Sequence, residues 1–287
     1  MRLLAKDPSE RPDSAQDVFN ALDAIDLTAR GETVERDASS LESLAGGVFV
    51  GRQAEMDQLK AGLEDVLGGS GRLIALMGEP GIGKTRTSEE FVTYAGLRGA
   101  QTLWGRCYET GGQPPYWPWV QAIRSYVREV DADDLRRQMG SSASVMAELI
   151  TDIKDRLPEV QAPPEIEDPD SARFRLFDSI ASFLKSASQT QPLVIVLDDL
   201  HWSDRPSLQF LEFMARELGQ SRVLLLCTYR DMELNRRHPL TVTLGGLARE
   251  RLYERVLLRG LTESDVGRFI GIASGVQPPQ ELSATVD

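Results

Sequence analysis

The amino-acid sequence predicts an α/β domain in which helices cover both faces of a parallel sheet. Three observations lead to this fold class. Short β-branched or leucine-rich runs alternate with long amphipathic stretches, a glycine-rich loop follows the first of these runs, and a pair of acidic residues ends a later one. Parallel strands need long crossover connections, which are usually helices, so this alternation favours a three-layer α/β architecture.

Five runs have the length and composition of buried strands, at residues 73–77, 102–105, 193–197, 223–228 and 252–258. Apolar residues recur at helical spacing between them, which predicts helices at about 54–67, 84–98, 117–130, 143–157, 171–187 and 206–218. Near the end of the chain, the segment Thr262-Glu263-Ser264-Asp265 is a capping box, and apolar residues at helical spacing follow it. One more helix is therefore expected there.

The composition excludes several classes of protein. The chain has 287 residues and a formal net charge of −12 at pH 7, which argues against a protein that mainly binds nucleic acid or an anionic membrane. No apolar run approaches the ~18–20 residues of a membrane span, and no signal-peptide core follows Met1, so a cytoplasmic location is expected. The two cysteines, Cys107 and Cys227, are expected to be buried thiols.

Three stretches lie outside the alternating pattern. Residues 1–27 carry an amphipathic helical pattern, and the polar residues 28–46 indicate a linker. Residues 131–170 contain eleven acidic and four basic residues. We interpret this stretch as a solvated helical insertion with a proline-broken loop at Pro158–Pro169. An interaction surface for a basic partner is the alternative.

The strongest chemical motif is the segment Gly78-Glu79-Pro80-Gly81-Ile82-Gly83-Lys84-Thr85, which fits the pattern G-x-x-x-x-G-K-[ST] between a predicted strand and a predicted helix. Glycines let successive backbone N–H groups point at a polyanion, and the first turn of the following helix favours negative charge. Lys84 supplies a positive charge for the β- and γ-phosphates. The Thr85 hydroxyl is an oxygen ligand suited to Mg²⁺.

An acidic pair ends the strand predicted at residues 193–197. Ligands of open α/β sheets gather at the carboxyl ends of the strands, so Asp198 and Asp199 should face the same crevice as the glycine-rich loop. We expect Asp198 to hold Mg²⁺, directly or through water. Because successive strand residues point to opposite sides, Asp199 is expected to orient or deprotonate an attacking water. His201 is expected to make a structural hydrogen bond, with a general-acid role as the alternative.

Taken together, several segments resemble a known family. Three segments are similar to AAA-type ATPase modules of bacterial signalling regulators, the STAND class. They are the loop at Gly78–Thr85, the segment Asp198-Asp199-Leu200-His201-Trp202-Ser203-Asp204 and the segment Leu225-Leu226-Cys227-Thr228-Tyr229-Arg230-Asp231. Phe49–Glu55, Gly105–Tyr108 and Pro114–Trp119 are also similar to segments of that family. The resemblance covers roughly residues 47–275.

The resemblance implies a P-loop ATPase core at residues 47–258, with a parallel sheet of order 5-1-4-3-2. The strand at 223–228 would then lie between the strand of the phosphate loop and the strand that ends at Asp198. Residues 259–287 would form the start of a helical lid. Residues 1–27 are similar to the last segment of a Ser/Thr protein kinase domain, with Arg11 at the position of a buried structural arginine; an ordinary amphipathic helix is the alternative.

The resemblance also implies roles for individual residues. Val50 and Arg52 would line the adenine and ribose side, for which a plain turn before a helix is the alternative, and Arg86 would belong to the nucleotide site. Thr228 and Arg230 would reach the γ-phosphate side as sensors. An ion pair with Asp231 or Glu233 is the alternative for Arg230. Trp202 is expected to pack against the crevice wall.

The function predicted on these grounds is that of an ATP-binding, slowly hydrolysing nucleotide switch with ATP and Mg²⁺ as cofactors. Lys84, Asp199 and Arg230 would be its catalytic residues. The expected partners are ATP or ADP, other domains of a kinase–ATPase regulator and a second copy of the chain, but neither a membrane nor nucleic acid. The sequence contains no kinase catalytic motif, so no kinase activity is expected. The alternatives are a DNA-associated ATPase of the origin-recognition type and an accessory ATPase of an active kinase.

Overall fold

A computed structural model describes residues 49–109, 112–235 and 237–274 of the chain. The predicted kinase-tail helix at residues 1–27 and the predicted linker at residues 28–46 lie outside the described residues. Within them, no helix is long and apolar enough to cross a membrane.

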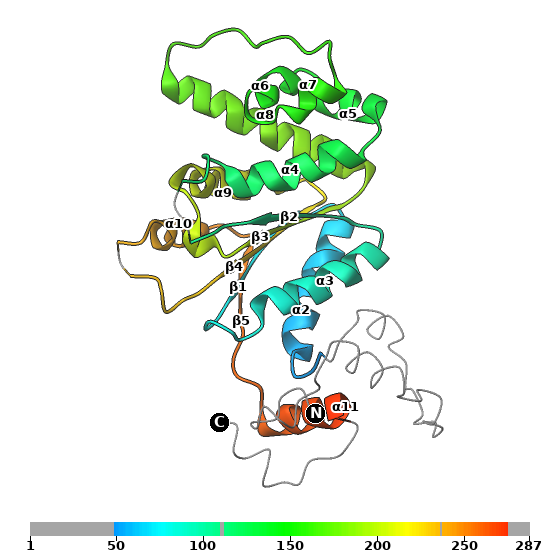
Figure 1. The fold of residues 1–287 in the computed structure, drawn as a ribbon, viewed down its shortest axis with the longest axis vertical. Coiled ribbons are helices and arrows are strands. Elements are labelled where there is room, and N and C mark those ends of the chain that lie inside the picture. The colour runs from blue at the N-terminus through cyan, green and yellow to red at the C-terminus, as the bar shows by residue number, and fades with distance from the viewer. Residues whose placement is uncertain (1–48, 110–111, 236, 275–287) are drawn as a thin grey trace, which may run out of the picture. The chain divides into compact units, whose positions relative to one another are not determined.

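The centre of the domain is a five-stranded parallel sheet with the order β2-β3-β4-β1-β5 (Figure 1). Read from its other edge, this is the predicted order 5-1-4-3-2, and β4 lies between β1 and β3 as expected. The strands are β1 (Arg72–Met77), β2 (Gln101–Arg106), β3 (Leu193–Asp198), β4 (Val223–Tyr229) and β5 (Tyr253–Leu257). The predicted α/β fold class and the predicted strands are therefore confirmed.

Helices cover both faces of this sheet (Figure 1). The described helices are α2 (Gln53–Leu67), α3 (Lys84–Leu97), α4 (Trp117–Glu129), α5 (Ala132–Met139), α6 (Ser142–Leu149), α7 (Asp152–Arg156), α8 (Pro169–Thr190), α9 (Arg205–Glu217), α10 (Pro239–Leu247) and α11 (Glu263–Ser274). A 3-10 turn, η4, spans Leu200–Trp202. The predicted helices need correction: the helix expected at 143–157 is two helices, α6 and α7, and neither α5 nor α10 was predicted as a separate helix.

Two apolar cores lie on opposite faces of the sheet, because successive strand residues point to opposite sides. In β1, Ile74 and Leu76 pack with α2 and α3, where Leu59, Leu63 and Phe91 are fully buried. Leu73 and Ala75 face the other, larger core, which includes residues of α4, α8, α9 and α10. Both cysteines lie buried as free thiols, and burial raises the pKa of Cys107 to about 12.

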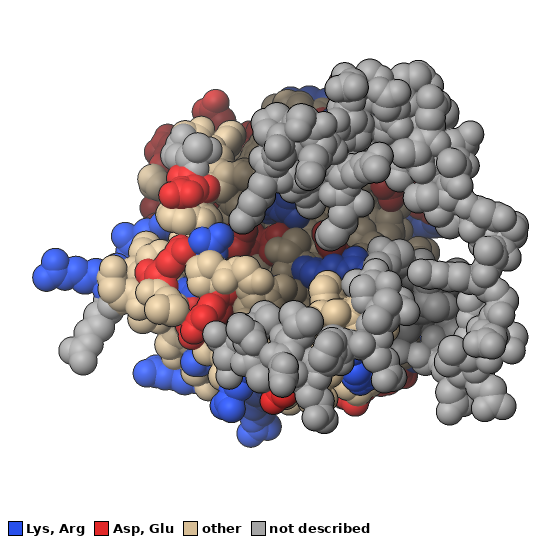
Figure 2. Space-filling view, turned by 60° about the horizontal axis from the view of Figure 1, so that its bottom comes forward, with Lys and Arg blue, Asp and Glu red and all other residues tan. Residues whose placement is uncertain are grey.

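The acidic stretch at residues 131–170 forms an outer layer made of α5, α6, α7 and the first turn of α8 (Figure 1). Its apolar side chains belong to the larger core, and several of its acids are paired with arginines. Asp152 pairs with Arg124 at 2.8 Å and with Arg128 at 2.7 Å, and Glu159 pairs with Arg136 at 2.6 Å. Figure 2, in which the lower end of Figure 1 comes forward, shows another face of the molecule, where acidic and basic side chains lie close together.

The last described helix, α11, begins with the predicted capping box. The Thr262 hydroxyl accepts a hydrogen bond from the Asp265 N–H at 3.2 Å, and the Asp265 carboxylate accepts one from the Thr262 N–H at 3.2 Å. The start of α11 also lies against Gly51, whose φ is +72°. A Cβ placed on Gly51 would come within 2.7 Å of side-chain atoms of Leu261 and Asp265. Only glycine fits this position without strain or displacement of α11.

Candidate functional site

The glycine-rich loop runs from the end of β1 to the start of α3. Gly81 and Gly83 have φ values of +77° and +99°, which L side chains rarely adopt, and a Cβ at either position would meet nothing within 4 Å. These glycines therefore serve the backbone conformation and leave open space beside the loop. Gly83 is the N-cap of α3, so the unpaired N–H groups of the first helical turn face that space. This arrangement favours an anion.

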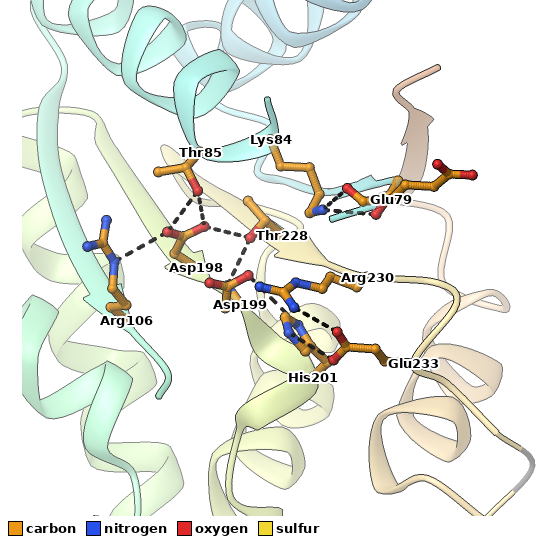
Figure 3. Close-up of polar contacts among 11 residues, drawn as sticks. Glu79, Lys84, Thr85, Arg106, Asp198, Asp199, His201, Thr228, Arg230 and Glu233 are labelled. Atoms are coloured by element: carbon orange, nitrogen blue, oxygen red, sulfur yellow. Dashed lines mark hydrogen bonds and ion pairs between the residues drawn. The ribbon is translucent and has the colours of Figure 1, made fainter. Parts of the chain in front are cut away.

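Lys84 holds its ammonium group against the loop (Figure 3). The residue is 6% exposed, and its Nζ donates hydrogen bonds to the carbonyl oxygens of Gly78 at 2.9 Å and Glu79 at 2.8 Å. Burial lowers the pKa of Lys84, while the nearby Asp199 acts in the opposite direction. A buried cation with backbone acceptors as its hydrogen-bond partners is well placed to meet an anion that enters the loop.

Asp198 is the most enclosed acid of the site, with 1% of the residue exposed. Its carboxylate meets side chains from three neighbouring elements (Figure 3). Thr228, from β4, donates a hydrogen bond to Oδ1 at 2.6 Å. The Thr85 hydroxyl, from α3, lies 3.3 and 3.4 Å from the two carboxylate oxygens. Nε of Arg106, from β2, lies 3.3 Å from Oδ2. The buried charge is therefore compensated by two hydroxyls and one guanidinium group.

The oxygen pair of Thr85 and Asp198 fits a magnesium ion. Mg²⁺ binds oxygen at about 2.0–2.1 Å in octahedral geometry, so neighbouring ligand oxygens lie roughly 3 Å apart. The separations of 3.3 and 3.4 Å between the two side chains are close to that value. Among the described residues, no three His, Cys, Asp or Glu side chains group as a metal site. A site of one carboxylate and one hydroxyl matches the preference of Mg²⁺ for few protein ligands.

Asp199 differs from its neighbour in backbone and in environment. β3 ends at Asp198, and Asp199 has the left-handed values φ 59° and ψ 46°. The alternation of strand residues, from which we predicted its direction, therefore does not apply. Its N–H donates to the Thr228 hydroxyl at 2.8 Å, and its side chain is 28% exposed. Strained backbone of this kind is common where a side chain must be aimed at a ligand.

Comparison with known protein families identifies this domain. A sequence model of the AAA ATPase domain matches residues 48–226, which is more than half of the chain. The chain belongs to the AAA ATPase domain family. This AAA ATPase domain is 25% identical over 197 residues to an uncharacterised protein of Rhizobium meliloti (strain 1021). The aligned region is 64% of this chain and 19% of that relative.

Two solved structures are similar to the AAA ATPase domain at low TM-scores. A chain of the Drosophila ORC bound to DNA is 12% identical with a TM-score of 0.38, and the match covers 72% of this chain and 93% of that chain. The Aeropyrum pernix ORC1 protein in complex with DNA is 16% identical with a TM-score of 0.39, and the match covers 84% of this chain and 57% of that chain.

On the β4 side of the AAA ATPase domain, Arg230 makes the ion pair that we considered as its alternative. Its Nη1 donates to Oε1 of Glu233 at 2.7 Å. This hydrogen bond raises the pKa of Arg230 and lowers that of Glu233. Thr228, the other expected sensor, is fully buried, and its hydroxyl bridges Asp198 and the Asp199 N–H. Its hydroxyl therefore links the two acids.

The residues expected near adenine and ribose join the loop to the end of the described chain. Arg52 is 6% exposed and donates to the carbonyl oxygens of Ile82 at 2.9 Å and Arg259 at 2.6 Å. Val50 is half-buried beside it in sequence. In this AAA ATPase domain Arg52 thus ties the phosphate loop to the segment between β5 and α11. Arg86, the residue after Thr85, pairs with Glu90 at 3.1 Å along α3.

Two features of the site were missed or misjudged from the sequence. Arg106 was noted only within a resembling segment, although it pairs in register with Asp198 at the edge of the sheet. The prediction of a structural hydrogen bond for His201 was wrong: the ring is buried, and neither ring nitrogen has a hydrogen-bond partner among the described residues. The neighbouring Trp202 is partly buried and packs against the larger core.

Proposed function

We propose that this AAA ATPase domain binds ATP together with Mg²⁺ and hydrolyses it slowly, so that the bound nucleotide acts as a switch. One observation carries the proposal. The Lys84 ammonium and the oxygen pair of Thr85 and Asp198 lie at the N-terminus of the same helix, α3, next to the open loop. A positive charge, free N–H groups and hard oxygen ligands at one helix end match the needs of a magnesium triphosphate.

Each residue would then have a separate task. The loop from Gly78 to Gly83 would bind phosphate oxygens through its N–H groups, and Lys84 would turn its ammonium from the loop carbonyls to the β- and γ-phosphates. Thr85 and Asp198 would hold Mg²⁺, which would offset negative charge on the phosphates. Asp199 would accept a hydrogen bond from the attacking water.

Slow turnover is proposed because the candidate base is poorly prepared. An aspartate side chain is shorter than that of glutamate, so it reaches less far toward a water. In the described residues, no donor orients the Asp199 carboxylate by a hydrogen bond. Slow hydrolysis suits a switch, since the triphosphate state must last long enough to be read. Arg52 and Gly51 connect the phosphate loop with α11, so this contact supplies a route from the nucleotide to the helix that follows the core.

The setting of the switch is proposed from the sequence resemblance. We propose that the domain belongs to a signal-transducing regulator of the STAND class, fused to a Ser/Thr kinase through residues 1–27, with other domains of that regulator as partners. The chain spans 19% of the length of the curated relative it matches, which agrees with a module within a longer protein. Self-association in the ATP state and a cytoplasmic location belong to the same proposal.

Calorimetry tests nucleotide binding directly. We expect Lys84→Ala to lose measurable affinity for ATP with Mg²⁺. Truncating a buried, hydrogen-bonded residue that pairs with an opposite charge costs about 2–5 kcal/mol of binding free energy. Lys154→Ala is the matched control, since Lys154 is an exposed lysine of α7 outside the site, and it should bind like the wild type. If the folded Lys84→Ala protein binds ATP as tightly as the wild type, the proposal is wrong.

A further inference from the structure

An open cavity of about 320 Å³ lies at the β2 edge of the sheet, between α3 and α4. The side chains that line it are Glu89, Trp104, Arg106, Tyr108 and Gln121. None of the residues that we assign to ATP or Mg²⁺ is among them. The volume is near the lower end of the roughly 300–1,000 Å³ that is usual for small-molecule sites, which suits a ligand of the size of an amino acid.

Two aromatic side chains form the apolar wall of this cavity. Tyr108 is 48% exposed, which is unusual for so large an apolar side chain. Trp104 is partly exposed, but its Nε1 is buried without a hydrogen-bond partner among the described residues. The indole therefore offers ring carbons, and not its N–H, to the cavity. Such a wall favours an apolar or aromatic group on the ligand.

One charged group of each sign lines the cavity, and in the described part of the chain the two do not pair with each other. Arg106 directs its Nε toward Asp198, whereas Figure 3 shows its two terminal nitrogens turned away from that carboxylate. Glu89 is 50% exposed, and its ion pair with Arg86 is long, at 3.8 Å. Arg86 makes a closer pair with Glu90 at 3.1 Å. The cavity therefore offers a cation and an anion that can both bind a ligand.

Gln121 holds the backbone at Arg106, so the two charged groups are left to recognise the ligand. The Gln121 amide donates to the Arg106 carbonyl oxygen at 3.1 Å and accepts from the Arg106 N–H at 3.2 Å, and it thereby occupies the open edge of β2 at this residue. A single guanidinium group beside Glu89 disfavours a polyanion such as a nucleoside triphosphate, because its charges would meet the carboxylate. A ligand with one negative and one positive group complements both side chains.

We propose that this cavity binds a free amino acid with an aromatic side chain. The terminal nitrogens of Arg106 donate to its carboxylate, Glu89 accepts from its ammonium group, and its ring packs against Trp104 and Tyr108. Arg106 keeps its Nε beside Asp198 in this arrangement, because its terminal nitrogens point the other way (Figure 3). Binding therefore requires no rearrangement of the candidate ATP site, and the inference stands apart from the proposed function.

Nuclear magnetic resonance of the ¹⁵N-labelled indole N–H groups tests the site in the full chain without nucleotide. The chain has four tryptophans, and the variant Trp104→Phe assigns the Trp104 signal. Trp119 is an internal reference, because it is fully buried and its Nε1 donates to the Ser207 carbonyl oxygen at 3.2 Å. The probe is L-phenylalanine. Two analogues accompany it: 3-phenylpropionate lacks the ammonium group, and phenethylamine lacks the carboxylate.

We expect L-phenylalanine to shift the Trp104 signal and to leave the Trp119 signal in place. Each analogue should bind about five- to tenfold more weakly than L-phenylalanine, because each lacks one contact with a partly exposed charge. The proposal is wrong if the Trp104 signal does not move at about 10 mM L-phenylalanine, which is weaker than any useful affinity. It is also wrong if either analogue binds as tightly as L-phenylalanine.

Two charge variants assign the contacts one by one. Glu89→Gln should weaken L-phenylalanine about five- to tenfold and leave 3-phenylpropionate nearly unchanged, since that analogue has no ammonium group. Arg106→Gln should likewise weaken L-phenylalanine and leave phenethylamine nearly unchanged. Glu129→Gln and Arg216→Gln change exposed charges outside the cavity and should bind like the wild type. An unchanged Trp119 signal shows that a variant is folded, and a folded variant that weakens all three compounds alike contradicts the assigned contacts.

Discussion

Asp198 and Asp199 are consecutive residues at the end of one strand, yet their surroundings differ. Asp198 is 1% exposed and is held by Thr228, Thr85 and Arg106. Asp199 is 28% exposed, and among the described residues its carboxylate accepts no hydrogen bond. Its Oδ1 lies 3.9 Å from Nδ1 of the buried His201 ring.

The difference assigns the two acids different physical roles. A buried carboxylate surrounded by hydroxyls and a guanidinium group is built into the fold, and its position is set before any ligand arrives. A partly exposed carboxylate on a left-handed residue keeps its hydrogen-bonding capacity for a ligand. Under the proposed function, the environment of each acid, and not its residue type, would distinguish the metal ligand from the base.

The largest expected effect comes from removing the charge of Asp199. Asp199→Asn should lower the rate of phosphate release about 10²- to 10⁴-fold, because a positioned base commonly contributes that factor, and it should leave ATP affinity nearly unchanged. Phosphate release and calorimetry on the same preparations measure both. Turnover equal to that of the wild type would remove Asp199 from the proposed role.

Asp198→Asn is the matched control for this comparison. The same substitution one residue earlier should act on the metal: the Mg²⁺ concentration needed for half-maximal ATP binding should rise, while binding without Mg²⁺ should persist. If both variants behave alike, the division of roles between the two acids is incorrect.

The sequence predicted the parts of the site that lie in continuous segments. Gly78–Thr85 is one continuous motif whose spacing is specific to a phosphate-binding loop. Asp198 ends a run of residues with the composition of a buried strand. Arg106 and His201 could not be placed in the same way. Their importance comes from contacts made after strands distant in sequence pair, as Arg106 and Asp198 do across β2 and β3.

Two errors in the fold have local causes. Met146, Ile150, Ile153 and Leu157 keep helical spacing across the break between α6 and α7, so periodicity alone could not reveal it. In α10, β-branched residues and two glycines lower the helix propensity. Leu240, Leu244 and Leu247 pack into the larger core, and this tertiary packing offsets the low propensity.

The hydroxyl that joins the two acids should contribute to stability. Thr228→Val keeps the shape of the side chain but leaves the Asp199 N–H without its acceptor and Asp198 without its 2.6 Å donor. We expect the free energy of unfolding to fall by about 1–3 kcal/mol, which urea titration measures. Thr228→Ser keeps the hydroxyl and should lose less. Equal stability of Thr228→Val and the wild type would show that the bridge is energetically unimportant.

The smallest expected effect concerns Arg106, and it tests whether the position of Asp198 is shared between a guanidinium group and a metal. Nε of Arg106 lies 3.3 Å from Oδ2 of Asp198, and its side chain is 43% exposed. A cation at that distance competes with Mg²⁺ for the carboxylate, but water screens so exposed a charge.

Arg106→Gln should therefore lower the Mg²⁺ concentration for half-maximal ATP binding only about two- to fivefold. The gain should shrink at high salt, because salt screens exposed charges. Arg124→Gln removes an arginine paired with Asp152 outside the site and should leave the Mg²⁺ dependence unchanged. A higher Mg²⁺ requirement in Arg106→Gln would mean that the guanidinium group aids metal binding, because it would then hold the Asp198 carboxylate in place for the ion.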